Sequence, residues 1–73
     1  MALINRVRQL RTRHGESLAE VAAAVGVSRQ QVNLIELGRS APSAEVMAKI
    51  ARHFNVAMDD LFFLDGDVVE VKR

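Results

Sequence analysis

The sequence predicts a compact all-α domain of five short helices, and three observations support this. Apolar residues repeat at intervals of three and four along most of the chain, which is the period of an amphipathic helix. Serines precede three of these repeats and glycines follow three, as expected at helix starts and ends. The 73 residues include no cysteine and are 49% hydrophobic with only three aromatics, so stability must come from packed aliphatic side chains.

The first predicted helix is rich in arginine and ends at Gly15, because glycine accepts the left-handed conformation that terminates many helices. Its apolar positions are Leu3, Ile4, Val7 and Leu10, and Arg6, Arg8, Arg11 and Arg13 lie between them. This spacing predicts one amphipathic helix that begins near Leu3.

The second predicted helix begins after Ser17 and ends at Gly26. Ser17 with Glu20 forms the Ser-x-x-Glu pattern of a capping box, in which each residue satisfies a backbone N–H of the other. Val21, Ala22 and Val25 supply the inner face. The helix is too short to be stable alone, so the rest of the chain must pack against it.

The third predicted helix runs from Ser28 to Glu36 and is the candidate functional element. Ser28 with Gln31 suggests a second capping box, and Val32 and Ile35 are the inward pair. The outward face then carries Arg29, Gln30, Asn33 and Leu34. Forked donors and acceptors of this kind pair with the edges of DNA bases, although without context such a face is simply solvated.

The last two predicted helices follow the loop Arg39 to Pro42. Ser43 caps a fourth helix with Val46, Met47, Ile50 and Phe54 inside, and Asn55 ends it. A short fifth helix is expected from about Met58 to Phe63, with Asp59 and Asp60 in its first turn. Val68 to Val71 has strand propensity but no evident partner strand within the chain.

Charge is divided unevenly along the chain. Residues 1–56 hold eight basic and four acidic side chains, whereas residues 57–73 hold five acidic and two basic ones. A basic body with an acidic end suits a protein that meets a polyanion on one side. No segment is long and apolar enough to span a membrane and no signal peptide is evident, which points to a cytoplasmic protein.

Enzymatic, metal and cofactor chemistry lack a basis in the sequence. His14 and His53 are far apart and have no cysteine beside them, so no metal site is predicted. No nucleophile, base and orienting group form a recognisable set, and no glycine-rich phosphate loop is present. The sequence therefore predicts no enzyme, no cofactor and no small-molecule effector.

A set of residues spaced along the chain resembles the phage-repressor (Cro/C1, XRE-like) type of helix-turn-helix DNA-binding domain. The set comprises Arg11, Gly15, Ser17, Ala22, Gly26-Val27-Ser28, Gln30, Ile35-Glu36, Gly38, Pro42-Ser43 and Ile50-Ala51. It runs from about Val7 to Phe62. The resemblance implies a λ-repressor-like five-helix fold and a small stand-alone transcriptional regulator that places its third helix in the major groove of double-stranded DNA. Such a regulator is expected to act as a repressor.

This hypothesis assigns roles to two groups of residues. Contacts to bases are expected from Arg29, Gln30, Asn33 and Leu34, with Leu34 touching a thymine methyl. Contacts to the DNA backbone are expected from Ser17, Ser28, Gln31, Arg39 and Ser40, because helix N-termini and basic loops bind phosphate. The resemblance also implies a structural ion pair between Arg11 and Glu36.

Three positions depart from the family pattern. Leu18 replaces a glutamine that commonly contacts phosphate, and Glu16 replaces a hydrophobic residue before the cap. Leu18 is expected to supply that missing core contact instead, and Glu16 would repel any phosphate it faced. Ala57 stands where a serine often caps the last helix, a loss of about 1 kcal/mol.

A homodimer is expected because one short helix contacts too little DNA for useful specificity. Residues 1–64 are assigned to the DNA-binding domain and residues 65–73 to a tail or dimerisation strand. The candidate dimer residues are Phe62, Phe63, Leu64, Val69 and Val71. A frayed acidic tail is the alternative for the end of the chain. The rival function is a protein-interaction module of the antitoxin or anti-repressor type that keeps the fold.

Overall fold

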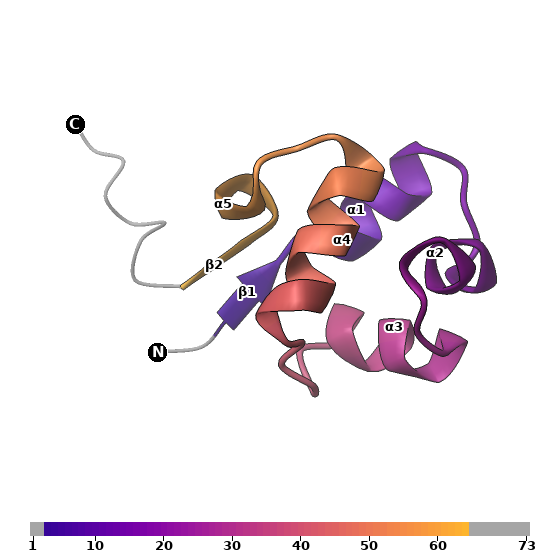
Figure 1. Ribbon diagram of the computed structural model, residues 1–73, viewed down its shortest axis with the longest axis horizontal. Coiled ribbons are helices and arrows are strands. Elements are labelled where there is room, and N and C mark those ends of the chain that lie inside the picture. The colour runs from indigo at the N-terminus through magenta and orange to yellow at the C-terminus, as the bar shows by residue number, and fades with distance from the viewer. Residues whose placement is uncertain (1–2, 65–73) are drawn as a thin grey trace.

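The computed structural model describes residues 3–64, which form five helices and two short strands (Figure 1). In chain order the elements are β1 (Leu3–Asn5), α1 (Val7–Arg13), α2 (Leu18–Val25), α3 (Arg29–Glu36), α4 (Ala44–Phe54), α5 (Met58–Leu61) and β2 (Phe62–Leu64). The fold is thus mostly helical, as predicted, with a small sheet that was not.

Serine side chains begin the three helices where they were predicted. Ser17, Ser28 and Ser43 each accept a hydrogen bond from the backbone N–H three residues later. At Ser17 the Glu20 carboxylate also accepts the N–H of Ser17, which completes the predicted capping box. Only the Ser28 half of the second predicted box is formed in the described structure.

Residues with positive φ end the helices or follow their last turn. Gly15, Gly26 and Gly38 have φ of 70°, 78° and 74°, and Asn55 has φ of 59°. An L-residue with a Cβ is strained in this region, whereas glycine is not and asparagine tolerates it. The predicted positions of these helix ends are therefore confirmed.

The predicted extent of the first helix is wrong at its start. Leu3–Asn5 is a strand that pairs antiparallel with Phe62–Leu64, with Leu3 opposite Leu64 and Asn5 opposite Phe62. The side chain of Asn5 accepts the N–H of Val7, so α1 begins only at Val7. Helical spacing at Leu3 and Ile4 was coincidental, because their backbone groups are satisfied by a strand almost sixty residues away.

The last helix is shorter than predicted for the same reason. It ends at Leu61, and Phe62 adopts extended backbone angles as the first residue of β2. The N–H of Arg6 donates to the carbonyl of Leu61 at 2.9 Å, which continues the link between the two ends of the domain. Ala57 starts α5 without a side-chain cap, as expected from its sequence.

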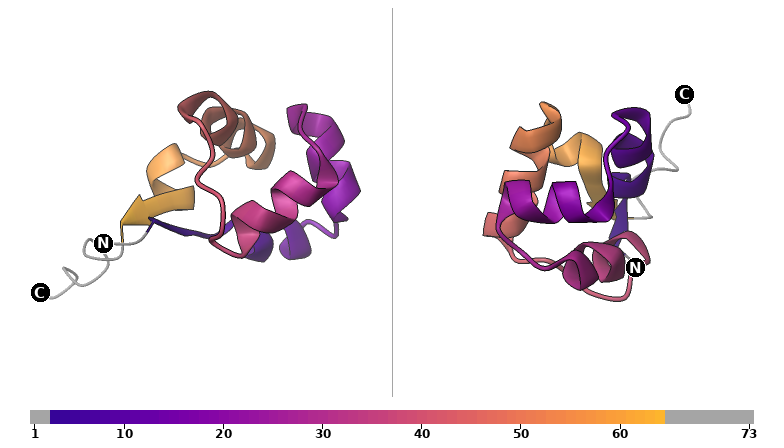
Figure 2. Two further views of the ribbon diagram at one scale, coloured as in Figure 1. Left: turned by 90° about the horizontal axis from the view of Figure 1, so that it is seen from below. Right: turned by 90° about the vertical axis from the view of Figure 1, so that its right-hand side faces the viewer.

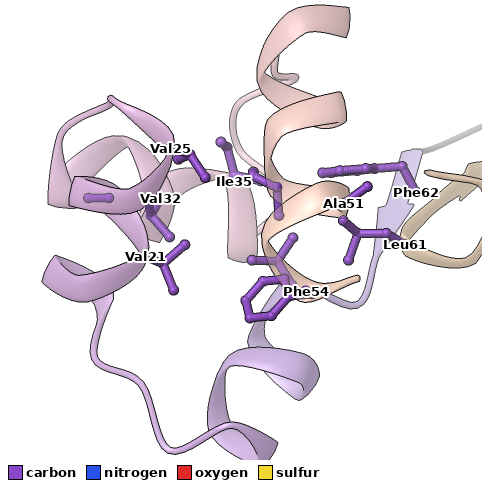
Figure 3. Close-up of a cluster of buried hydrophobic side chains, with 11 residues drawn as sticks. Val21, Val25, Val32, Ile35, Ala51, Phe54, Leu61 and Phe62 are labelled. Carbon is purple, nitrogen blue, oxygen red and sulfur yellow. The ribbon is translucent and has the colours of Figure 1, made fainter. Parts of the chain in front are cut away.

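The core lies between α4 and the surrounding helices (Figure 3). Its buried members are Val7, Val21, Ala22, Val25, Val32, Ile35, Ile50, Ala51, Phe54, Leu61 and Phe62. All of these side chains are aliphatic or phenylalanine. Phe62 comes from the sheet and the others come from helices. Packed hydrocarbon therefore replaces the disulfides or metals that many domains of this size require.

The elements are arranged so that α2 and α3 lie toward one end of the described structure and the sheet lies toward the other (Figure 2). Helix α3 packs mainly against α2, and its outer side forms the lower edge of the molecule in Figure 1. Of the predicted functional residues on this helix, Arg29, Gln30 and Asn33 are exposed, with the start of α2 beside them.

Candidate functional site

The outer face of α3 presents polar side chains to solvent. Arg29, Gln30 and Asn33 are exposed, while Val32 and Ile35 on the opposite side are buried in the core. Together with Leu18 from the start of α2, the three polar residues line a shallow hollow of about 400 Å³. The structure thus brings three of the four predicted base-contacting residues to one surface.

Leu34 and Gln31 are less accessible than the other predicted contact residues. Both are partly buried on α3, so each offers only part of its side chain to a ligand. A half-buried leucine is still able to make an apolar contact with its exposed part.

The N-termini of α2 and α3 are both accessible, since Ser17 and Ser28 are exposed. The first N–H groups of a helix lack intrahelical partners, and they favour a nearby anion. At Ser17 this effect is opposed, because the Glu20 carboxylate is hydrogen-bonded to the Ser17 N–H at 2.7 Å. The start of α3 has no acidic residue in its first turn and is the more favourable of the two for phosphate.

The loop after α3 supplies one exposed cation. Arg39 is exposed, and its N–H donates to the carbonyl of Leu34 at 2.9 Å, which fixes its backbone to the end of α3. Ser40 is partly buried beside β1 and lines a small hollow with Leu3 and Asn5. Arg39 is therefore freer to contact a phosphate than Ser40.

Arg11 and Glu36 form an ion pair that joins α1 to the end of α3. Arg11 Nε donates to Glu36 Oε2 at 2.6 Å and Arg11 Nη2 donates to Oε1 at 3.1 Å, while Nη1 donates to the Glu16 carbonyl. Only 15% and 3% of the two side chains is exposed. The hydrogen bond to Glu36 raises the pKa of Arg11. The negative charge of Glu36 also raises this pKa, whereas burial of the guanidinium lowers it.

The Glu16 side chain contacts His53 on α4. Its Oε1 lies 2.6 Å from His53 Nε2, with about a quarter of each side chain exposed. The His53 ring in turn packs edge-on against Phe54 at 4.9 Å between centroids. Leu18 packs against the core, as expected from the departure at this position. Both departures thus have a structural use next to the start of α2.

The predicted dimer residues in β2 differ in how far they are buried. Phe62 is buried in the core of the single chain, with 6% of its surface exposed, and its remaining surface lines a hollow with Phe63 and Leu64, so its part in a dimer interface stays a prediction. Phe63 is partly buried beneath the Arg6 guanidinium, 5.0 Å from the ring centroid, and Leu64 is 41% exposed. Val69 and Val71 lie outside the described residues.

Two structural contacts near the N-terminus were missed from the sequence. Asn5 donates its side-chain amide to the carbonyl of Ile35 on α3 at 2.8 Å, and Arg6 covers Phe63. Asparagine side chains often accept a backbone N–H at a helix start, and the place of Asn5 two residues before Val7 was the available signal. This signal was missed because the first helix was predicted to begin at Leu3, which placed Asn5 inside the helix.

Two negative findings apply to residues 3–64. No group of three His, Asp or Glu side chains is arranged to hold a metal ion. None of the helices in this part of the chain is long and apolar enough to cross a membrane.

Residues 7–61 match the family described as Helix-turn-helix. The HTH-type transcriptional regulator YgzD of Bacillus subtilis, itself uncharacterized, is 41% identical over 63 residues, 86% of this chain and 96% of that protein. An uncharacterized HTH-type transcriptional regulator of Archaeoglobus fulgidus is 39% identical over 62 residues, 85% of this chain and 89% of its own length.

Solved structures of regulatory proteins also resemble this chain in sequence and fold. The restriction-modification controller protein C.AhdI from Aeromonas hydrophila is 32% identical with a TM-score of 0.73, over 78% of this chain and 86% of that one. The clp gene regulator ClgR from C. glutamicum is 30% identical with a TM-score of 0.67, over 74% and 70% of the two chains.

Proposed function

The chain belongs to the helix-turn-helix family and is a DNA-binding transcriptional regulator, and from this premise we propose that it recognises double-stranded DNA sequences with α3 in the major groove. Arg29, Gln30 and Asn33 contact base edges in this proposal, and Leu34 contributes an apolar contact. An α-helix fits the width of the major groove, where each base pair presents a distinct pattern of donors and acceptors.

The observation that carries the proposal is the exposed row Arg29, Gln30 and Asn33 on a helix whose opposite side is buried in the core. A rigidly held helix presents its side chains in a fixed register, which base recognition requires. The hollow between this row and Leu18 leaves room for the edge of the groove at the start of α2.

The backbone of the DNA is proposed to meet the residues around this row. Ser28, Gln31 and Arg39 are the stronger candidates, since the start of α3 carries no acid and Arg39 is exposed. Ser17 and Ser40 are weaker ones, because Glu20 lies beside Ser17 and Ser40 is partly buried. Such contacts fix the position of the protein on DNA without selecting its sequence.

A homodimer completes the proposal, because a single eight-residue helix contacts too few base pairs for a regulator. The candidate interface is the mainly apolar end of the domain, a hollow of about 460 Å³ that is lined by Leu3, Met47, Met58, Asp59, Phe62, Phe63 and Leu64. Met58 and Leu64 are among the most exposed large hydrophobic residues of the described chain. The residues after Leu64 are proposed to join this interface as the tail or dimerisation strand.

Repression is the proposed mode of regulation, because a small DNA-binding dimer blocks other proteins by occupying its site. The rival function, an interaction module of the antitoxin or anti-repressor type, is favoured slightly by Leu18, by Glu16 as a charge that opposes phosphate, and by the modest net charge of +1. The contact of Glu16 with His53 and the packing of Leu18 against the core give both residues another role, which weakens the argument from these two positions.

The proposal is tested by titrating a random-sequence duplex with the protein at a series of salt concentrations. Phosphate contacts release counterions, so the logarithm of the binding constant is expected to fall steeply as the logarithm of the salt concentration rises. Binding that is undetectable even at low salt would refute DNA recognition and favour the protein-interaction module. Selection of sites from a random DNA pool then gives the sequence, and half-site spacing reports the dimer.

A further inference from the structure

Helix α3 is held along its whole length by its buried side, and its C-terminal end has two further side-chain links. Val32 and Ile35 fix it to the core, and Ser28 caps its start. Its end is joined to the N-terminal part of the chain by two side-chain contacts, the Arg11–Glu36 ion pair and the hydrogen bond from Asn5. These two links therefore act together with the buried Ile35 in setting the orientation of that end.

Asn5 uses both ends of its amide group. Its Nδ2 donates to the carbonyl of Ile35 at 2.8 Å, and its Oδ1 accepts the N–H of Val7 at 3.1 Å. Its backbone is held in β1 opposite Phe62, whose side chain is buried. A single partly buried side chain thus ties the sheet, the start of α1 and the end of α3 together.

The carbonyl of Ile35 does not depend on Asn5 for a partner. It also accepts the N–H of Gly38 at 3.0 Å within the turn that ends α3. Loss of the Asn5 amide consequently leaves no unsatisfied group, so the fold should survive it. What is lost is the external contact that sets where the end of α3 lies.

The same strand borders the loop that carries Arg39. Leu3 and Asn5 line a hollow of about 240 Å³ with Gly38, Ser40, Ala41 and Pro42. Asn5 is thus the β1 residue that both borders this loop and is bonded to the helix before it. A shift of the helix end would move Asn33 and Arg39 together, since Arg39 N–H is bonded to the Leu34 carbonyl.

We propose that Asn5 is a positioning residue for DNA recognition, whose amide holds the C-terminal end of α3 and the following loop in the orientation that base contacts need. This inference rests on the proposed use of α3 in the major groove. Functional side chains lose precision when the shell that supports them loosens, even though the fold remains intact.

The test compares Asn5→Asp with the wild-type chain. Aspartate keeps the oxygen that accepts the Val7 N–H but has no N–H for the Ile35 carbonyl. The readout is the ratio of affinities for a selected site and for random duplex, at a temperature where circular dichroism shows every variant folded. We expect this ratio to fall roughly tenfold, as for the loss of one base contact.

Two control variants separate positioning from charge and from stability. Gln9→Glu makes the same amide-to-carboxylate change at an exposed position of α1, and it should weaken both duplexes alike. Val56 follows α4 and packs against the core, and Val56→Ala removes its two methyl groups from that contact. This variant should have a lower melting temperature and an unchanged affinity ratio. If Asn5→Asp does not fold, Asn5→Ser replaces it, since serine is neutral and its hydroxyl can accept the Val7 N–H.

A measurement without DNA examines the same link. Amide hydrogen exchange in Asn5→Asp should be faster at Leu37, Gly38 and Arg39, whose N–H groups close the end of α3, and unchanged at Gly26 at the end of α2. An affinity ratio equal to that of wild type in a variant that still binds DNA overturns the positioning role alone. Failure of the wild-type chain to bind any duplex overturns the proposed function, and this inference with it.

Discussion

The carboxylate of Glu36 has 3% of its side-chain surface exposed and receives two hydrogen bonds from Arg11. A charge enclosed to this degree is tolerable only while its partner is present. Lys49 and Glu45 form a contrasting pair on α4, 3.2 Å apart with 51% and 77% of their side chains exposed. Comparison of the two pairs therefore tests how the contribution of an ion pair to stability depends on its burial.

Glu36→Ala should lower the free energy of unfolding by about 2 to 4 kcal/mol, because it leaves the guanidinium of Arg11 enclosed without its counter-charge. In a domain of this size that corresponds to a fall in melting temperature of about 10 °C or more. Glu45→Ala is the matched control and should change stability by less than about 0.5 kcal/mol. Equal melting temperatures for Glu36→Ala and wild type would remove the ion pair from the account of stability.

Gln30 and Arg39 should respond differently to removal, since one is proposed to contact a base and the other a phosphate. Gln30→Ala should reduce discrimination at one base pair by about 1 to 3 kcal/mol. Arg39→Ala should weaken all sequences alike and reduce the salt slope by about 1. Competition binding with selected and random duplexes measures both effects. If Gln30→Ala weakens every sequence equally, Gln30 is not a base-contacting residue.

Among the elements, α5 is the least supported by its own sequence. It has four residues and begins at Ala57 with no side-chain cap, whereas α2, α3 and α4 each begin with a serine that accepts a backbone N–H. The backbone of Ala57 already has the extended conformation of a cap residue, with φ of −70° and ψ of 148°. Serine should therefore fit there without rearrangement.

Ala57→Ser should stabilise the domain by up to about 1 kcal/mol, because the new hydroxyl can share the N–H of Asp60, which already donates to the Ala57 carbonyl at 3.0 Å. The melting temperature should rise by about 4 to 8 °C. Ala48→Ser is the control, since the same change in the exposed middle of α4 lowers helix propensity and should cost about 0.5 kcal/mol. An unchanged or lower melting temperature for Ala57→Ser would show that the start of α5 lacks a free N–H to cap.

The two ends of the described molecule have different surfaces. Polar residues of α3 occupy one, and an apolar hollow bounded by β1, β2, α4 and α5 occupies the other. In the sheet each strand has one partner among residues 3–64, so its outer edges are open to further pairing. This separation would let the proposed dimer form without covering the face proposed to contact DNA.

Leu64→Ser should convert the proposed dimer to a monomer while the domain stays folded, because Leu64 is 41% exposed and lies outside the core. Sedimentation equilibrium over a range of concentrations measures the change. Leu37→Ser is the matched control, since Leu37 is 52% exposed at the end of α3. Loss of the dimer in Leu37→Ser, with the dimer retained in Leu64→Ser, would move the interface to the other end of the molecule.

Most of the fold could be predicted because its signals are local. The caps at Ser17, Ser28 and Ser43 and the positive φ of Gly15, Gly26 and Asn55 depend on residues within one turn, so the sequence reveals them directly. The inward pair Val32 and Ile35 follows from helical periodicity. With the inner side known, the outward row Arg29, Gln30 and Asn33 could be predicted as well.

By itself, the sequence determined where α2, α3 and α4 begin and end, where α1 ends, which face of each helix is buried, and the family to which the chain belongs. Only the tertiary structure decided that Leu3–Asn5 pairs with Phe62–Leu64, that Phe62 enters the core, and that Asn5 and His53 join separate elements. Local patterns report on neighbours within a turn of helix, whereas these contacts join residues from 30 positions apart, for Asn5 and Ile35, to 61 positions apart (64 − 3), for Leu3 and Leu64. Such pairings are selected by the packing of the whole chain, so they become visible only once it is folded.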